Sequence, residues 1–310
     1  MNLTKKITPK RYLWIFIISA LLFTLFITIV SFKSLFFDQL FGFQSLYKHQ
    51  LDKLSSQDEI ETVFVGDSSL GNLINAELFS SLSSNKTINL ALTGFYGYAG
   101  SYNMLKRAIA NKKNRIKNVV LLQSIDAMKR PISFEGYILT LSSLDDFMEL
   151  KPNEMINMIK AFYTLTLSPG NLTSIIKHYL GLSLYKYPIE NDYIKQESKM
   201  LTNQDPAPIT MSSEMGKTAF LLRIIRFCNA NNINLIYAHG PIWRQIGEKS
   251  SDYINTINEI LSTTGVKLIK EVVFIDNKDI GDSGDHVIPN KKSSFTEKYF
   301  RLLKPLLTEI

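Results

Sequence analysis

A serine stands in a short segment, TVFVGDSSLGN, where a run of apolar and β-branched residues meets a turn. The run at 62–65 favours a buried strand, and Gly66-Asp67-Ser68-Ser69 follows it directly. A serine hydroxyl becomes an effective nucleophile when a base accepts its proton and N–H groups stabilise the oxyanion that forms. The first hypothesis is therefore that Ser68 attacks an acyl carbon. The alternative is an ordinary helix cap, because Asp and Ser are favoured at helix N-termini.

An Asp/His segment near the end of the chain could supply the base. Asp282-Ser-Gly-Asp285-His286 follows the last predicted strand and precedes the last predicted helix. In an open parallel sheet, ligands bind outside the carboxyl ends of the strands, and this segment can reach the same edge as Ser68. A serine, a glycine-rich loop and an oriented histidine on one edge are what acyl transfer requires.

The elements that would position these groups alternate between strand and helix. A strand at 60–67 is followed by helical spacing from Leu70 to Leu78, a second strand, a helix and a third strand. This βαβαβ run predicts a parallel sheet covered on both faces. The further strands are predicted at 86–92, 116–124, 233–241 and 266–276, and the further helices at 102–111, 215–232, 251–265 and 295–307. Short amphipathic helices interrupt the pattern at 131–208, which predicts an inserted helical cap.

Three more segments follow predicted strands and could line the same edge. They are Thr93–Gly97, Gln123–Asp126 and His239–Trp243. Tyr96 lies in the glycine-rich sequence TGFYGYAGS, which should expose its ring for contact with a carbohydrate. For His239, we favour a structural or substrate-contact role over that of a base or a metal ligand.

The quoted motifs resemble the sequence blocks of the SGNH (GDSL-type) hydrolase superfamily. The first block of that family, Gly-Asp-Ser-x at the end of the first strand, matches residues 66–69. The resemblance implies that Ser68 is the nucleophile and that its own N–H is one oxyanion donor. Gly94 in NLALTG is similar to the glycine of the second block, whose N–H would be the second donor. The closing Asp-x-x-His block makes His286 the base, and the implied fold is a flavodoxin-like three-layer α/β/α domain.

The Asp/His segment departs from the family pattern by one residue. The family's aspartate lies three positions before the histidine, where this chain has Ser283. Asp282 is one position further from His286, and Asp285 is adjacent to it. We favour Asp282 as the partner of the imidazole, because a side chain next to the histidine rarely turns back to accept from its Nδ1–H. Asp285 is the alternative.

The third block of the family departs as well. Its usual Gly-x-Asn-Asp aligns with Gln123-Ser124-Ile125-Asp126, so the asparagine that would give a third oxyanion donor is missing. Loss of such a donor costs about 2.7–4 kcal/mol of transition-state stabilisation, unless Gln123 or Ser124 replaces it. We therefore expect a specialised acyl-transfer site or a degenerate one, rather than the site of a highly active lipase.

An apolar segment at 12–32 contains no charged residue and is long enough to cross a bilayer as one helix of roughly 20 residues. Four basic residues precede it, which predicts that residues 1–11 stay in the cytoplasm and that the rest lies outside. We favour an uncleaved anchor over a signal peptide, because the apolar run is long and no small-x-small site follows it. Residues 33–57 would then form a helical stalk, and 58–310 the SGNH-like domain with its insertion.

The composition argues against several other kinds of site. Cys228 is the only cysteine, so neither an intramolecular disulfide nor a cysteine-based zinc site can form. The four histidines are dispersed without paired ligand spacing, so we expect no metal and no other cofactor. The net charge of +7 includes the basic N-terminal tail, and the basic cluster at 106–117 fits a solvated helix end better than a nucleic-acid surface.

A membrane-anchored, outward-facing domain of this kind resembles the proteins that work beside membrane-bound O-acyltransferases in bacterial surface-polymer acylation. The resemblance implies an acyltransferase or esterase, anchored in the plasma (inner) membrane, that adds or removes an acyl group such as acetyl on a surface polysaccharide. A non-catalytic protein that uses the same scaffold to bind glycan or a membrane partner is the alternative.

Overall fold

The computed structural model describes residues 8–36, 44–141, 143–182, 186–190, 192–196, 206–212 and 219–307. By its internal contacts the chain divides into two compact units. The smaller is Met1–Gly42 with Tyr163–Tyr185, and the larger is Phe43–Phe162 with Lys186–Ile310. The larger unit contains the sheet and all of the predicted site residues.

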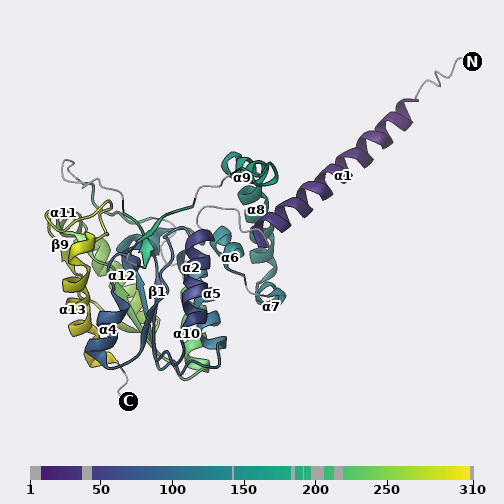
Figure 1. The fold of residues 1–310 in the computed structure, drawn as a ribbon. Helices are drawn as coiled ribbons and strands as arrows, with labels where there is room; N and C mark the ends of the chain where they lie inside the picture. The colour runs from purple at the N-terminus through teal and green to yellow at the C-terminus, as the bar shows by residue number, and fades with distance from the viewer. Residues whose placement is uncertain are drawn as a thin grey trace, which may run out of the picture. The chain divides into compact units, whose positions relative to one another are not determined.

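Five parallel strands form the central sheet of the larger unit (Figure 1). They are β1 (Thr62–Gly66), β2 (Thr87–Asn89), β3 (Asn118–Gln123), β6 (Asn234–His239) and β8 (Lys267–Ile269). Their order is β2-β1-β3-β6-β8, which is that of a doubly wound, flavodoxin-like sheet. In register, Val63 lies between Ile88 and Val119 of the neighbouring strands. The predicted α/β class and the parallel sheet are confirmed.

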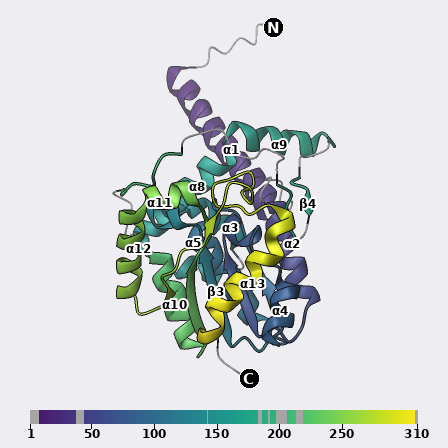
Figure 2. The ribbon, with the colours of Figure 1, turned by 90° about the vertical axis from the view of Figure 1, so that its left-hand side faces the viewer.

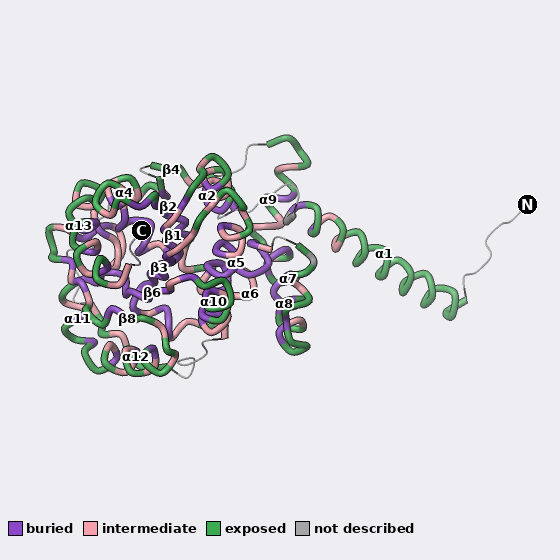
Figure 3. Tube along the Cα trace, turned by 90° about the horizontal axis from the view of Figure 1, so that it is seen from below, coloured by how far each residue is buried: buried purple, intermediate pink, exposed green. Residues whose placement is uncertain are grey.

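Helices cover the two faces of this sheet in separate layers (Figure 3). On one face lie α4 (Ala76–Ser83) and α13 (Lys292–Leu303), and on the other lie α5 (Gly97–Ala110) and α10 (Ala219–Ala230). At one edge of the sheet, α12 (Ser251–Thr263) packs beside β8. Because both faces are covered, β1 and β3 are buried along their whole length, as the apolar runs in the sequence predict.

The helix α2 (Gln44–Ser56) packs against the edge of the sheet formed by β2. Gln50 donates through Nε2 to the carbonyl of Ala91 at 2.9 Å, and Lys53 donates to the carbonyl of Asn89. Leucine side chains on the same helix are buried. The residues predicted to form a stalk thus include a helix that belongs to the larger unit.

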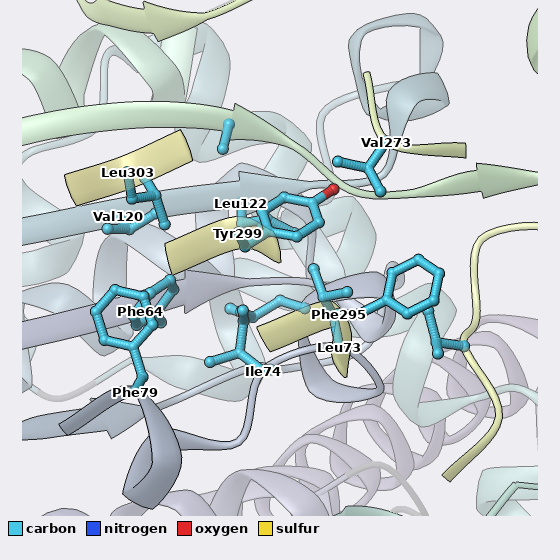
Figure 4. Close-up of a cluster of buried hydrophobic side chains, with 14 of the residues drawn as sticks. Phe64, Leu73, Ile74, Phe79, Val120, Leu122, Val273, Phe295, Tyr299 and Leu303 are labelled. Carbon is cyan, nitrogen blue, oxygen red and sulfur yellow. The ribbon is translucent and has the colours of Figure 1, made fainter. Parts of the chain in front are cut away.

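Aromatic side chains fill much of the space between the sheet and the layer formed by α4 and α13 (Figure 4). Phe64 of β1 meets Phe79 of α4 edge to face, with ring centroids 4.8 Å apart. Phe79 in turn meets Phe300 of α13 edge to face at 5.4 Å. Burial of these rings ties the first strand, the helix after it and the last long helix of the chain into one core.

The segment 266–276, predicted as one strand, forms two. After β8, the short strand β9 (Phe274–Ile275) pairs in parallel with β7 (Ile242–Trp243) in a separate two-stranded sheet. The segments that follow β6 and β8 both leave the main sheet at the same level. Pro241, two residues after the end of β6, has no N–H with which to continue the ladder. The charged residues at 270–271, just after β8, are exposed. The prediction of a single strand at 266–276 is wrong, because the interruption depends on the segment that pairs with it, 234–243, and not on its own residues alone.

Short helices occupy much of the region predicted as an insertion. They are α6 (Phe134–Thr140), α7 (Leu144–Met148), α8 (Pro152–Thr166) and α9 (Pro169–Tyr179). The region also contains an antiparallel hairpin of two short strands, β4 (Ile189–Glu190) and β5 (Tyr193–Ile194). The hydroxyl of Tyr193 donates to the carbonyl of Leu92 at 2.6 Å, which fixes this hairpin against the segment that follows β2.

The smaller unit contains a long apolar helix, α1 (Pro9–Phe36). Residues Pro9–Ser34 are long and apolar enough, by length and composition, to cross a membrane, and none of their most apolar window is buried. Large side chains such as Trp14 and Phe16 are exposed along it. The helix extends beyond the predicted 12–32 span at both ends. Figure 2 shows it as the purple ribbon labelled α1.

Phe79→Ala should lower the free energy of unfolding by about 3–5 kcal/mol, because it leaves a cavity between two phenylalanine rings. Leu82→Ala on the same helix is the matched control, since Leu82 is 37% exposed. Its effect should stay within about 0.5 kcal/mol. Urea unfolding of the full chain in detergent, followed by tryptophan fluorescence, measures both variants. Equal losses would contradict this placement of Phe79.

Candidate active site

Ser68 lies where the first strand turns into a helix. The strand β1 ends at Gly66, and Asp67 caps α3 (Ser68–Gly71) by accepting a hydrogen bond from the N–H of Ser69 at 3.1 Å. A Cβ on residue 66 would lie 1.7 Å from a carbonyl oxygen of β3, so only glycine allows this close approach of the two strands. The turn therefore presents Ser68 at the carboxyl edge of the sheet.

The two serines of this turn have different environments. Ser69 is fully buried, and its hydroxyl donates to Asp67 Oδ1 at 2.7 Å. Ser68 is partly exposed, and within the residues that the structure describes neither its hydroxyl nor its N–H makes a hydrogen bond. Ser68 is therefore the serine whose hydroxyl is available to react.

Asp67 connects the Ser68 turn to the chain that follows the third strand. Its Oδ2 accepts from the hydroxyl of Ser124 at 2.6 Å and from the N–H of Ser124 at 3.1 Å. The same oxygen accepts from Nη1 of Arg130 at 3.3 Å. Asp67 is only 1% exposed, so these donors offset the cost of burying its charge. The carboxylate thereby fixes two segments of the site against each other.

An aspartate in the loop before α13 orients His286. The Nδ1 of His286 lies 2.7 Å from Asp282 Oδ1, and its Nε2 is buried with no hydrogen-bond partner among the described residues. Asp285, the alternative partner, lies 3.7 Å from Nε2 and accepts from the hydroxyl of Ser283 at 2.5 Å. Asp282 is thus the carboxylate in hydrogen-bonding position, and Nε2 is available to accept a proton.

The charges around His286 hold its pKa above the ordinary value of 6.5. Burial alone would lower this pKa, but the hydrogen bond to Asp282 and the charges of Asp285, Asp282 and Asp67 together raise it. For Asp285, burial raises the pKa of the carboxyl, although the charge of His286 acts in the opposite direction and lowers it. Because the charge of Asp67 acts on His286, the Ser68 turn and the histidine loop share one electrostatic environment.

Gln196 joins the histidine loop to the Ser68 turn. Its Nε2 donates to Asn72 Oδ1 at 2.9 Å and to the carbonyl of Val287 at 2.6 Å. Asn72 in turn donates through Nδ2 to the carbonyl of Ser68 at 2.9 Å. Ser68 and His286 share no hydrogen bond here, and such bonds often tighten only when substrate binds. No sequence pattern marks Gln196, because it lies in the region predicted as a helical insertion.

Gly94 presents a backbone N–H that, like that of Ser68, makes no hydrogen bond within the described part of the chain. The two predicted substitutes for the missing asparagine are engaged elsewhere. Gln123 is fully buried and donates to Ser101 Oγ at 3.0 Å. Both the N–H and the hydroxyl of Ser124 donate to a carboxylate. Neither side chain is therefore positioned as a third oxyanion donor.

Tyr96 does not occupy the exposed position that the glycine-rich sequence predicts. Its side chain is 0% exposed, and its ring lies 6.4 Å from that of Tyr47. The helix α5 begins at Gly97, which has a φ of +54°, and a Cβ on Gly100 would lie 2.5 Å from Tyr96. These glycines serve helix entry and close packing rather than an open loop. The predicted exposure is wrong, and a buried ring cannot contact a sugar.

His239 ends β6 and is bound to α12. It is 1% exposed, and its Nε2 lies 2.8 Å from Asn258 Oδ1. Burial lowers the pKa of His239, against the hydrogen bond with Asn258. In the described ranges, no group of three or more His, Cys, Asp or Glu side chains could hold a metal ion. A neutral, buried imidazole held by an amide fits the structural role.

Arg130 is a residue of the site that the sequence analysis missed. It follows the short 3₁₀ helix η1 (Ile125–Lys129), and its Nη2 donates to Asp126 Oδ1 at 2.6 Å. The spacing of four residues between an acid and a base is the signal that could have indicated this pair. Its contact with Asp67, however, is decided by the fold alone.

Comparison with known proteins finds likeness at the level of structure rather than sequence. No family model matches the sequence, and no curated protein matches it. Among solved structures, the chain is similar to a protein assigned to the lipolytic G-D-S-L family from Desulfitobacterium hafniense DCB-2. The two are 10% identical, the match covers 79% of this chain and 100% of that one, and the TM-score is 0.36. A likeness of this size says nothing about activity, which must be inferred from this chain's own residues.

The rate at which Ser68 reacts with a fluorophosphonate should fall at acid pH, because His286 accepts a proton only when it is neutral. The midpoint should lie above pH 6.5, since the pKa of His286 is raised. Asp282→Asn removes a charge that raises this pKa, so the midpoint should move to lower pH while the plateau rate falls by about 10⁴-fold. The pH dependence of fluorophosphonate labelling of the full chain measures both quantities.

Asp276→Asn is the matched control for this experiment. Asp276 pairs with Arg244 at 2.8 Å on the surface near the same loop, so its loss should leave the midpoint unchanged. An upward movement of the midpoint in Asp282→Asn would show that Asp282 is not the partner of the imidazole.

Proposed function

We propose that this chain is an SGNH-type acyltransferase or esterase that works outside the cytoplasm and adds or removes an acyl group, such as acetyl, on a cell-surface polysaccharide. One observation carries the proposal. Ser68 has an unbonded hydroxyl at the end of β1, while His286 has its Nδ1 bound to Asp282 and its Nε2 unbonded within the described residues. A hydroxyl, an imidazole and a carboxylate in these states can form and break an ester through an acyl-serine.

In the first half-reaction, Ser68 Oγ attacks the acyl carbonyl carbon while its proton passes to Nε2 of His286. Asp282 stabilises the imidazolium, and the N–H groups of Ser68 and Gly94 donate to the oxyanion. The oxyanion then collapses, the bond to the leaving oxygen breaks, and that oxygen takes the proton from His286. The products are an acyl-serine and an alcohol.

In the second half-reaction, a hydroxyl group gives its proton to His286 and attacks the acyl-serine. The bond between the acyl carbon and Ser68 Oγ breaks, and Oγ recovers the proton from the imidazole. Water as the attacking group gives hydrolysis, and a sugar hydroxyl gives transfer. Both outcomes use the same residues, so the acceptor that enters the site decides between them.

The N-terminal part of the chain supports a location at the bacterial plasma (inner) membrane. Its α1 is long and apolar enough to span a bilayer, and basic residues precede it, which favours a cytoplasmic N-terminus. The larger unit would then face the compartment that contains surface polysaccharides. An acyl group made in the cytoplasm must cross the membrane to reach it, so we propose a membrane-bound O-acyltransferase as the partner that supplies it.

Ser68→Ala and His286→Ala should each lower the acyl-transfer rate by at least about a thousandfold, because each removes a group that acts in both half-reactions. Fluorophosphonate labelling with peptide mapping should find Ser68 in the wild-type chain, and polymer acetylation in cells should be lost in both variants. The partly or fully exposed residues Ser81 and His49 provide the controls Ser81→Ala and His49→Ala. Normal acetylation in both site variants, at normal expression, would favour the non-catalytic alternative.

The proposed orientation predicts opposite results for two reporter fusions at the C-terminus. Alkaline phosphatase should be active there, because its disulfides form only outside the cytoplasm, and a green fluorescent protein that folds only in the cytoplasm should stay dark. Deletion of residues 12–32 should reverse both signals and is the control. A dark phosphatase and a bright fluorescent fusion on the full chain would rule out the outward-facing arrangement.

A further inference from the structure

The guanidinium of Arg130 is almost fully engaged by groups of the candidate site. Its Nε and Nη2 donate to Asp126 at 3.2 and 2.6 Å, and Nη2 also donates to Ser124 Oγ at 2.8 Å. Its Nη1 donates to Asp67 Oδ2 at 3.3 Å. A guanidinium carries five N–H groups, and these bonds use four of them. One N–H on Nη1 has no partner within the described residues.

That remaining N–H belongs to the nitrogen that lies against Gly94. A Cβ on Gly94 would be 2.3 Å from Nη1, so the guanidinium fits here only because residue 94 has no side chain. The backbone N–H of Gly94 itself makes no hydrogen bond within the described part of the chain. The same Nη1 bonds Asp67, the residue before Ser68, so the guanidinium lies beside the turn that carries the proposed nucleophile. Arg130 and Gly94 also line a small cavity, whose lining residues do not include Ser68 or His286.

With only the N–H groups of Ser68 and Gly94 as donors, the site would stabilise the oxyanion less than a site with three donors does, and its reaction would be slower. Gln123 and Ser124, the side chains at the aligned positions, are engaged with other groups. Resting on the proposed function, we propose that Arg130 supplies the third oxyanion donor through its unbonded Nη1–H. A charged donor binds an oxyanion more strongly than a neutral amide does. Asp67 and Asp126 hold the guanidinium in place, so no reorganisation is needed during the reaction.

The alternative is that Arg130 only neutralises the buried carboxylate of Asp67. The two roles differ in what they change: a structural role alters stability, whereas a donor role alters the rate of formation of a tetrahedral adduct. Fluorophosphonate is a suitable probe, because its phosphoryl oxygen takes the position of the oxyanion when it bonds to Ser68. A rate measured on protein that is shown to be folded therefore reports on the donor.

Arg130→Gln should lower the second-order rate of Ser68 labelling, and kcat for p-nitrophenyl acetate, by about 10²–10³-fold, with KM changed by less than about threefold. Lys129→Gln removes the same charge one residue earlier and should label at the wild-type rate, because among the described residues the side chain of Lys129 does not bind the carboxylates of the site. Thermal unfolding of the full chain in detergent, measured in parallel, establishes that each variant is folded.

Arg130→Lys carries the test if Arg130→Gln does not fold. Its ammonium can pair with Asp126 but cannot also present a fixed N–H beside Gly94, so labelling should fall by at least about tenfold. A wild-type labelling rate in a folded Arg130 variant would overturn the assignment of Arg130 while leaving the Ser68 mechanism intact. Absence of labelling at Ser68 in the wild-type chain would overturn the proposed function, and the role of Arg130 with it.

Discussion

The candidate site depends on the hydrogen bonds that surround the buried carboxylate of Asp67. A carboxylate at 1% exposure is costly unless several donors surround it. Here the donors come from the helix turn that carries Ser68, from Ser124 after β3 and from Arg130 after η1. Satisfying this one charge therefore draws together three segments of the candidate site.

The histidine loop is held by a second set of contacts that does not involve this carboxylate. Gln196 connects it to the chain after Ser68, and the N–H of Trp243 donates to the carbonyl of Gly284 at 2.6 Å. The short β7–β9 pair thus continues beyond the main sheet toward the loop that carries His286. Rigid elements on both sides can hold the imidazole in one orientation, which a proton acceptor needs if it is to act in both half-reactions.

A guanidinium in place of an amide changes the electrostatic character of an oxyanion site. Its positive charge would favour the developing negative charge, but two carboxylates already bind it and reduce its net effect. The same carboxylates prevent the guanidinium from swinging into solvent. In the proposed arrangement, the same few side chains would carry activity, charge balance and local stability, so substitutions among them should not act additively.

The sequence by itself determined the features that each segment encodes locally. Buried apolar runs at 62–65 and 118–122 predict parallel strands, and the residue types of Ser68, Asp282 and His286 mark them as candidates for acyl-transfer chemistry. The tertiary structure alone decided which polar groups meet, since Asp67 and Ser124 are 57 positions apart and Gln196 and Asn72 are 124 apart. The tertiary structure also decided the burial of Tyr96. The local glycine content predicts a loop that exposes the ring, whereas in the fold this segment leads into α5 and the ring packs against other elements. Periodicity records what one segment buries, but a site is built from contacts between segments, and these exist only after the sheet has brought its strand ends together.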